Sequence, residues 1–389
     1  MNPPALPRIV SMLFCLENEQ GHIYSYNLSV GKAARMLGWE HVAALRAAAN
    51  IATLPEGWSL CLGTRQSYFR FRPLVKIEKM FKLVWSLLSY FRAQSGRSRP
   101  VIYFLEWFDH IHLIGFCLAL LLTRRKGDRY VWLVHRFEFT KMPITRLYRL
   151  LHALIRWRVG QGRLVLFTET DLVAESLKAT FGQTVFVLPM PQIISPNEQP
   201  RLPAWNDSQE RAGKVVCWWP GIPSGAKGLA TVDQLIRRAG PEAKHICIVA
   251  DQRAGFAQAT GGCQLILLPP GMPRADYLGW LYTMDLALLP YDPLSYATRT
   301  SGPFADAISA GKPPVVTDGT WMSHELRKYD LSELILDWTS PHVMTDLLRL
   351  PTDPDVLQKL EKIRNDYARF HSIAGYADTI GKVYDLTRQ

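Results

Sequence analysis

The sequence of 389 residues lacks several features that would fix its class at once. None of its six cysteines belongs to a Cys-x-x-Cys pair, so we expect buried, reduced thiols, as is usual in the cytosol. The N-terminal residues lack the basic, apolar and small-residue order of a signal peptide. The longest uncharged apolar run, residues 111–123, is shorter than the roughly 20 residues that span a bilayer. We therefore expect a soluble cytoplasmic chain, with peripheral contact to a membrane's inner face as an option.

Charge is also sparse: charged residues make up 20% of the chain and hydrophobic residues 48%, which excludes a disordered protein. The net charge of +11 is uneven. Residues 1–190 hold 25 Lys+Arg and 12 Asp+Glu, a net +13, whereas residues 191–389 hold 20 and 22, a net −2. A chain of this length exceeds one ordinary core. Both observations favour two domains with different partners.

Short apolar runs alternate with segments of helical period, which is typical of α/β domains with parallel sheets. A segment with five prolines and no apolar period interrupts the alternation at residues 189–213. The sequence thus predicts an N-terminal domain (1–190), a linker (191–213), a C-terminal domain (214–365) and a C-terminal helix (366–389) that returns to the first domain. In such sheets, ligands bind beyond the carboxyl ends of the strands.

The segment 286–317 (LALLPYDPLSYATRTSGPFADAISAGKPPVVT) carries the clearest chemical pattern. A strand, a polar loop, a helix from Ser301 to Gly311 and a second strand are expected. Backbone N–H groups of Ser301 and Gly302 at the helix N-terminus favour an anion such as a diphosphate. Asp306, early on that helix, could accept two hydrogen bonds from a ribose diol. The alternative from the residues alone is an ordinary N-cap serine and a solvated aspartate.

This segment resembles the donor signature of GT-B glycosyltransferases, especially family 4 of group 1, which runs Glu-x7-Glu, Ala, a small residue, Gly and Pro-Val-Val. Residues 306–316 match its second half without gaps. The resemblance implies two Rossmann-like domains with parallel sheets facing a cleft, a nucleotide-sugar donor and no cofactor. It gives Asp306 the ribose. The first acid falls at Thr298, so Tyr291, Tyr296 and Arg299 are the neighbouring residues expected to contact the donor.

A second match lies in residues 217–236 (CWWPGIPSGAKGLATVDQLI), which resembles the family's strand, Gly-rich loop, Lys-Gly and helix. The resemblance implies that Lys227 contacts the donor phosphates, with Gly221 and Gly228 beside it. Ile222 stands where the family usually has arginine. In the N-terminal half, residues 17–41 and 130–139 resemble the family's glycine turn and its strand that ends in a cleft histidine. That likeness places Gly21, His22 and His135 at the cleft.

Glycosyl transfer needs a leaving diphosphate to be neutralised, and Lys227, Arg299 and the helix at Ser301 could do so without a metal. No Asp-x-Asp motif lies in a plausible loop, so no metal is expected. An inverting enzyme also needs a base on the acceptor hydroxyl, whereas retention stays equally open. The predicted catalytic residues are His135, which could contact the donor sugar, and the three candidate bases Glu106, Asp109 and His22. Each could equally be an ordinary core, solvated or salt-bridged side chain.

Residues 70–99 are basic and amphipathic, with lysines at 76, 79 and 82 on one side of a helix, and residues 145–159 add further basic and aromatic residues. This pattern suits an interfacial helix on anionic lipid, or else a core helix with a solvated edge. We expect a saccharide or lipid-linked acceptor, as in polysaccharide or glycolipid assembly. The alternatives are a sugar-nucleotide epimerase of the same architecture and a nucleic-acid-binding protein, although no nucleic-acid motif is present.

Overall fold

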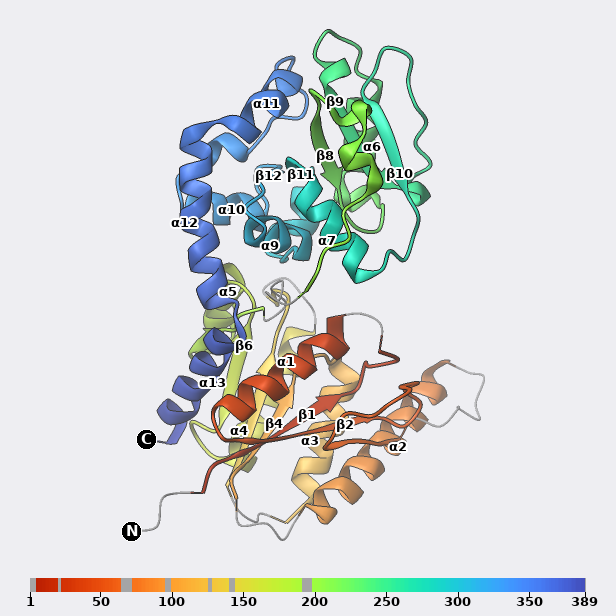
Figure 1. Ribbon diagram of the computed structural model, residues 1–389. Coiled ribbons are helices and arrows are strands. Elements are labelled where there is room, and N and C mark those ends of the chain that lie inside the picture. Colours follow the sequence, from red (N-terminus) through yellow and green to blue (C-terminus); the bar gives the residue numbers. More distant parts are fainter. Residues whose placement is uncertain are drawn as a thin grey trace. The chain divides into compact units, whose positions relative to one another are not determined.

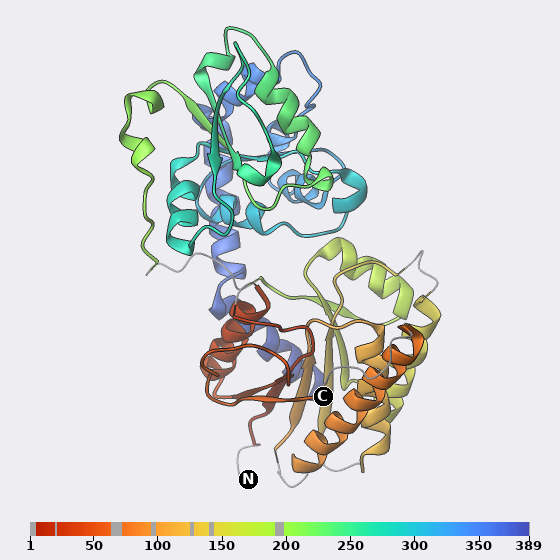
Figure 2. The same ribbon diagram turned by 90° about the vertical axis from the view of Figure 1, so that its right-hand side faces the viewer.

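The computed structural model describes residues 5–19, 22–63, 72–94, 99–124, 128–139, 144–190 and 198–388, and it divides into two compact units. Unit 1 comprises residues 1–192 and 371–389, and unit 2 comprises residues 193–370. Each unit contains one parallel sheet with helices on its faces (Figures 1 and 2). Two parallel α/β sheets are the fold class that the alternation of apolar runs predicts.

The sheet of unit 1 has seven strands in the order β3-β2-β1-β4-β5-β6-β7, all paired in parallel. Parallel strands need crossover connections, and helices supply them here except between β2 and β3, which a loop joins. The elements are β1 (Arg8–Leu13), α1 (His22–Met36), β2 (Glu40–Arg46), β3 (Trp58–Leu62), α2 (Arg72–Ala93), β4 (Val101–Leu105), α3 (His110–Leu122), β5 (Arg129–Val134), α4 (Thr145–Val159), β6 (Leu164–Thr168), α5 (Asp171–Phe181), β7 (Val185–Val187) and α13 (Ile373–Arg388).

Two hydrophobic cores lie on opposite faces of this sheet, because successive side chains of a strand alternate between faces. Tyr103 and Leu105 of β4 pack with helices α2, α3, α4 and α5, whereas Ile102 and Phe104 pack with α1 and α13. Helix α13 lies beside α1, where Tyr376 contacts the ring of Tyr26. The last helix of the chain therefore belongs to the core of unit 1, although most of its sequence neighbours belong to unit 2.

The sheet of unit 2 has five parallel strands in the order β10-β9-β8-β11-β12. Its elements are β8 (Val215–Trp219), α6 (Leu229–Arg237), β9 (Ile246–Asp251), β10 (Gln264–Leu268), α7 (Arg274–Thr283), β11 (Leu286–Leu289), α8 (Pro293–Tyr296), α9 (Gly302–Ser309), β12 (Pro314–Val316), α10 (Trp321–Arg327), α11 (Val343–Arg349) and α12 (Pro354–Phe370). The last two helices, α12 and α13, are separated by a break that coincides with the change of unit.

The described part of the predicted linker, residues 198–213, packs on unit 2 rather than running free. The backbone N–H of Arg201 donates to the Ala275 carbonyl, and its guanidinium forms an ion pair with Asp276. The segment lies so close to α7 that a Cβ on Gly279 would stand 1.9 Å from the Arg201 carbonyl oxygen. Within the described residues, no helix is long and apolar enough to cross a membrane.

Candidate functional site

The carboxyl edge of the unit 2 sheet has a topological switch between β8 and β11. The chain leaves β8 for β9 on one side, whereas after β10 it crosses back to β11 on the other side. The neighbouring loops after β8 and β11 therefore diverge, and such a divergence opens the crevice in which doubly wound sheets bind ligands. The two segments with the predicted donor motif begin in these two loops.

Lys227 ends a short 3₁₀ helix, Gly225–Lys227, that follows β8. Its carbonyl accepts a hydrogen bond of 2.9 Å from the Trp219 indole, which fixes the loop to the strand. Its ammonium lies against Gly221, since a Cβ on that glycine would stand 2.9 Å from Nζ. Gly228 has φ +81, and a Cβ there would overlap the Pro290 carbonyl at 2.1 Å. The loops after β8 and β11 therefore touch at a point where only glycine fits.

The charges around Lys227 at this edge of the sheet are positive. Burial and the positive charge of Arg299 both lower the pKa of Lys227. Within residues 198–388, no carboxylate forms an ion pair with this half-buried ammonium. The ring centroid of Tyr291 is 5.9 Å from its Nζ. Tyr296 packs on Tyr291, and the Arg299 guanidinium lies 5.2 Å from the Tyr296 centroid. The structure thus brings together four residues that the sequence pairs with a donor.

The N-terminus of α9 offers less to an anion than the sequence predicts. Ser301 is the N-cap, and its hydroxyl accepts the N–H of Phe304 at 3.3 Å. Pro303 has no N–H to donate. Of the first three helical residues, only Gly302 therefore keeps an N–H that could meet a ligand, and no side chain or backbone lies within 4 Å of where its Cβ would be. The phosphate site consequently depends more on side-chain cations than on the helix terminus.

Asp306 is held by a neighbour that the sequence did not point out. The Tyr277 hydroxyl of α7 donates to its Oδ2 at 2.7 Å. Burial raises the pKa of Asp306, while the Tyr277 hydrogen bond and the charge of Arg274 lower it. Arg274 is itself paired with Glu198 at 3.2 Å. One carboxylate oxygen is therefore committed to the protein, and the other is the one that could meet a ribose hydroxyl.

A pocket of about 750 Å³ opens at the same edge of the sheet, toward β12. Gly228 and Tyr291 line it, as the sequence predicts for a site here. The rest of its wall comes from residues that sequence reasoning missed, among them Asp318, Arg327 and Trp338. A signal existed for Asp318 only, because it follows the predicted strand 313–317 directly, where a parallel strand places ligand-binding residues. The others come from α10 and the segment after it, which carry no recognisable motif.

In unit 1, the predicted base Glu106 follows β4 and lies inside an ionic cluster. Arg136 pairs with Glu106 at 3.1 Å and with Glu169, which follows β6. The Asn27 amide donates to Glu106 at 2.9 Å, and the Arg136 guanidinium stacks 3.7 Å from the centroid of Trp107. Burial raises the pKa of Glu106 to about 8, against the lowering charge of Arg136. The Glu106 side chain has no exposed surface, so a substrate hydroxyl does not reach it in this conformation.

His135 is a core residue of unit 1, which corrects its predicted place at a cleft. Its Nε2 lies 3.2 Å from Nε2 of His152, and rings of Phe139, Tyr148 and Phe181 surround it. Burial, together with the charge of His152, lowers its pKa well below the usual value. Apolar packing thus explains a histidine at the end of a strand without any substrate.

Asp109 serves local structure as the N-cap of α3, in a capping box with His112. Burial would raise its pKa, but the hydrogen bonds and charge of His112 bring it down to about 2. A carboxylate with so low a pKa is a weak base. His22 is the first residue of α1, but its side chain lies outside the described residues, as does Gly21.

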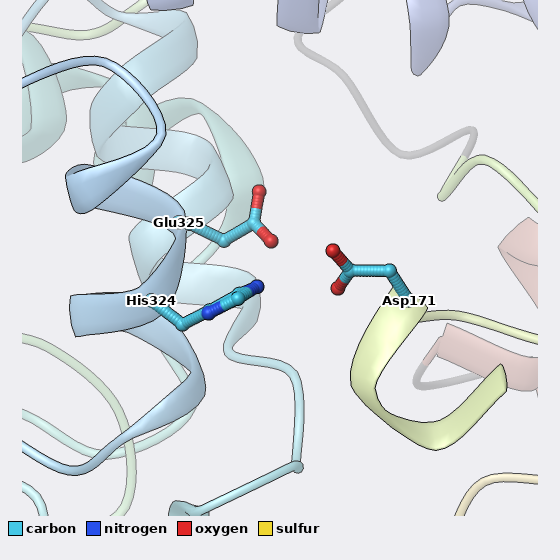
Figure 3. A group of neighbouring side chains, drawn as sticks. All are labelled: Asp171, His324 and Glu325. Atoms are coloured by element: carbon cyan, nitrogen blue, oxygen red, sulfur yellow. The ribbon is translucent and has the colours of Figure 1, made fainter. Parts of the chain in front are cut away.

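Figure 3 draws a group of possible metal-ligating residues: His324 and Glu325, which extend from α10, and Asp171, which begins α5. Glu325 already accepts hydrogen bonds from Lys328 at 2.6 Å and Tyr367 at 3.2 Å. Asp171 belongs to unit 1 and the other two residues to unit 2, so we assign no ligand to this group.

Comparisons of the sequence find no match: no protein-family model matches the chain, and no curated protein does. Comparisons of the structure do find matches. The structure described as trehalose-6-phosphate from E. coli bound with UDP-2-fluoro glucose aligns with TM-score 0.65 at 12% identity, over 98% of this chain and 99% of that chain. The N-terminal domain of Candida albicans trehalose-6-phosphate phosphatase aligns with TM-score 0.64 at 11% identity, over 99% and 98%.

Sucrose-phosphate synthase from Thermosynechococcus elongatus aligns with TM-score 0.58 at 12% identity, over 98% of both chains. These alignments extend over both units, and the two parallel sheets match the two-domain GT-B fold of such neighbours. The fold expected from the sequence is therefore confirmed.

Proposed function

We propose that this chain is a glycosyltransferase that binds a nucleotide-sugar donor at the carboxyl edge of the unit 2 sheet. The observation that carries the proposal is Lys227, a half-buried ammonium with no carboxylate partner in residues 198–388 and with Arg299 near enough to depress its pKa. Two neighbouring cations in a crevice cost free energy unless an anion joins them, and a diphosphate is such an anion. These cations would neutralise the phosphate that leaves during transfer.

Asp306 gives the proposal its second contact. With Oδ2 held by Tyr277, its other oxygen is oriented and could accept a hydrogen bond from a ribose hydroxyl. Asp306 and the cations lie on successive elements of one sheet edge, as the parts of one nucleotide require. The fold fits this reading, since the E. coli neighbour was solved with UDP-2-fluoro glucose. In this proposal the transfer needs no cofactor, because the nucleotide sugar is itself a substrate. It also needs no metal.

The test is a thermal-shift and calorimetry screen of UDP-, GDP-, ADP- and TDP-sugars. We expect one nucleotide class to stabilise the protein. Lys227→Ala should weaken its binding roughly 10- to 100-fold, since hydrogen bonds to charged groups are worth about 1.5–3 kcal/mol. Lys244→Ala is the matched control, because Lys244 is an exposed lysine of the same unit. Asp306→Ala should cost about tenfold.

Two outcomes contradict the proposal: no nucleotide stabilises the wild type, or Lys227→Ala and Lys244→Ala respond alike. The alternatives give other products. An epimerase would convert the nucleotide sugar without an acceptor, which product analysis by mass spectrometry detects. A nucleic-acid-binding protein using the basic unit 1 would bind DNA or RNA in a salt-dependent manner and ignore nucleotide sugars.

For the acceptor, we infer that unit 1 docks on an anionic membrane surface and takes a lipid-linked saccharide in polysaccharide or glycolipid assembly. Helix α2 exposes three large apolar side chains one helical turn apart: Ile77 (48% exposed), Phe81 (64%) and Trp85 (68%). Lys79 and Arg92 of the same helix are exposed too. A helix that exposes an apolar row and also exposes basic side chains suits the boundary between lipid headgroups and acyl chains.

The adjacent helices extend this apolar face. Leu122 of α3 is 67% exposed, and Leu150 and Trp157 of α4 are 55% and 73% exposed. Helix α3 packs against both α2 and α4, and all three cover one face of the sheet. The exposed side chains therefore belong to one outer layer of helices.

Flotation with vesicles tests the membrane inference. Phosphatidylcholine vesicles containing phosphatidylglycerol should bind the protein, and added salt or pure phosphatidylcholine should weaken binding. Replacing Phe81 by serine should reduce binding about tenfold, because burying such a side chain is worth about 1.5–3 kcal/mol. Leu294→Ser, which changes a 95% exposed leucine of unit 2, should leave binding unchanged. Equal loss in both variants would refute this role of α2.

A further inference from the structure

The pocket of about 750 Å³ in unit 2 extends well beyond the residues that the proposed donor site uses. Of the predicted donor residues, Gly228 and Tyr291 line it, whereas Lys227, Arg299 and Asp306 do not. Its wall is built from the loops after β8, β11 and β12, together with residues 332–339. A volume of this size is ordinary for a small-molecule site. The chemistry of the wall, taken residue by residue, indicates which class of molecule fits.

The charge of the pocket disfavours a phosphate. Its charged lining residues are Asp292, Asp318, Asp337 and Arg327, which give three negative charges and one positive charge, a net −2. The carboxylates are ionised at neutral pH, because hydrogen bonds from Ser295, Arg327 and Thr339, respectively, lower their pKa values. The one cation is already paired, since Arg327 lies 2.7 Å from Asp318. A nucleotide or sugar phosphate would therefore be repelled here.

An aromatic side chain stands in this polar wall and is held rigidly. The Trp338 indole donates from Nε1 to the Thr317 hydroxyl at 3.0 Å, so its polar edge is satisfied by the protein. The backbone behind it is tied to the sheet, because Leu336 N–H donates to the Val316 carbonyl at 2.9 Å. The indole is half-buried and lines the pocket. A fixed apolar ring of this kind offers contact area at little cost in conformational entropy.

Hydroxyl groups also line the pocket, on Thr231, Ser332 and Thr339. Oδ1 of Asp337 accepts both the backbone N–H and the hydroxyl of Thr339, so Oδ2 is the oxygen that a ligand hydroxyl could meet. Such a wall can accept many hydrogen bonds and donate several. A neutral molecule with an apolar ring face and a rim of hydroxyls matches both the indole and the carboxylates, and a sugar ring is that molecule.

We propose that this pocket is a saccharide-binding site for one or two neutral sugar rings, separate from the donor phosphates, with Trp338 as the stacking platform and Asp337 and Asp318 as hydroxyl acceptors. Only the biological role of this pocket rests on the proposed function, since a transferase needs to hold the saccharide that it extends. Binding to the pocket itself requires neither a donor nor turnover.

The test uses two probes, cellobiose and its oxidised form, cellobionate, in which one neutral ring is replaced by an open, anionic chain. Binding is followed by ligand-detected NMR. Cellobiose should bind, and cellobionate should bind at least tenfold more weakly. Trp338→Ala should weaken cellobiose binding at least tenfold. Because loss of the indole could disturb the loop, Gly225→Leu is the second variant. Gly225 lines the pocket, and a Cβ there would meet no atom within 4 Å, so we expect the leucine side chain to occupy pocket space.

Trp157→Ala, which removes a 73% exposed tryptophan of unit 1, is the control and should bind cellobiose like the wild type. The proposal is overturned if no neutral saccharide of a maltose, cellobiose and sucrose panel binds. It is also overturned if Trp338→Ala and Gly225→Leu both keep wild-type affinity, or if cellobionate binds as well as cellobiose. The nucleotide screen reads the donor site separately: Lys227→Ala should lose the nucleotide and keep cellobiose, and Trp338→Ala should do the reverse.

Discussion

The two units have the same architecture but opposite treatments of charge at the carboxyl edges of their sheets. In unit 1, Arg136 lies between Glu106 and Glu169, and because the raised pKa of Glu106, about 8, keeps that carboxyl protonated at neutral pH, Glu169 balances the charge of Arg136 inside the protein. In unit 2, Lys227 and Arg299 lie near each other and Lys227 has no acidic partner in residues 198–388. A sheet edge whose charges are balanced by its own residues gains little binding free energy from an ionic ligand. A sheet edge with uncompensated positive charge gains more, because an anion balances that charge.

The net charges of the two units favour the opposite assignment, with the anion in unit 1. The charges at the two sheet edges must therefore be compared locally. Unit 1 holds 27 Lys+Arg and 14 Asp+Glu, a net +13, and unit 2 holds 18 and 20, a net −2. An anion drawn only by long-range attraction would prefer unit 1. We nevertheless expect the anionic donor in unit 2, because desolvated cations in a crevice bind more strongly than screened surface charges.

The largest effect should come from removing Arg136 from the ionic cluster that it forms with Glu106 and Glu169. Arg136→Met leaves two buried carboxylates facing each other without a cation, and breaking a buried pair costs about 3–5 kcal/mol. We expect a loss of roughly that size in the free energy of unfolding, measured by urea denaturation, with faster hydrogen exchange in β4. Arg146→Met, at an exposed arginine of α4, should stay within about 0.5 kcal/mol of wild type. Similar stability of the two variants would mean that the cluster contributes little.

The sequence was sufficient to predict the strands of both sheets, because runs such as residues 130–135 and 286–291 have the continuous apolar character of strands buried on both faces. It also paired Lys227 with Arg299 and Tyr291, since each belongs to a motif fixed by a strand end. It left open whether Glu106 and His135 reach a cleft or the core, and the structure buries both. Both follow strands, but whether such a side chain turns into the core or out to solvent depends on partners such as Arg136, which are distant in sequence.

The other omissions have the same physical origin. Tyr277, which holds Asp306, comes from a helix 29 residues earlier, and no local pattern marks a phenol that will meet a carboxylate. Pro303 was visible, yet its missing N–H matters only once the Ser301 hydroxyl is seen to occupy the next donor. The pocket depends on residues 332–339 returning to β12, a tertiary contact that composition does not encode.

The second prediction concerns how the stability of unit 1 depends on pH. The folded-state pKa of Glu106, about 8, lies above its ordinary value of 4.5, so between these pH values the folded state keeps a proton that the unfolded state has lost. Wild-type stability from this group is complete below pH 4.5 and falls as the pH rises toward 8. Glu106→Gln removes that fall, so its stability relative to wild type should rise by up to about 1.4 kcal/mol per pH unit. Glu175→Gln, at an exposed acid of α5, should follow wild type.

Removing charge from unit 2 should have the opposite sign to removing it from unit 1. Lys227→Met takes away a half-buried ammonium that no acid compensates, so we expect the nucleotide-free protein to gain about 1 kcal/mol of unfolding free energy, as functional sites often do when they are neutralised. Nucleotide binding should be lost in the same variant. Lys244→Met should change neither quantity. A loss of stability in Lys227→Met would mean that the ammonium is already compensated, and the contrast between the two edges would fail.

The smallest effect tests whether the two cations of unit 2 sense each other. Arg299 lowers the pKa of Lys227, so Arg299→Gln should raise it, and only slightly because the exposed guanidinium is screened. The acylation rate of Lys227 against pH, followed by mass spectrometry of its peptide, measures this shift: its midpoint should move to higher pH in the variant. Lys312 is an internal control, since burial lowers its pKa without a contribution from Arg299. A midpoint that moves equally for both lysines would show a general change in the unit, whereas a shift confined to Lys227 identifies a pair of cations that an anion would join.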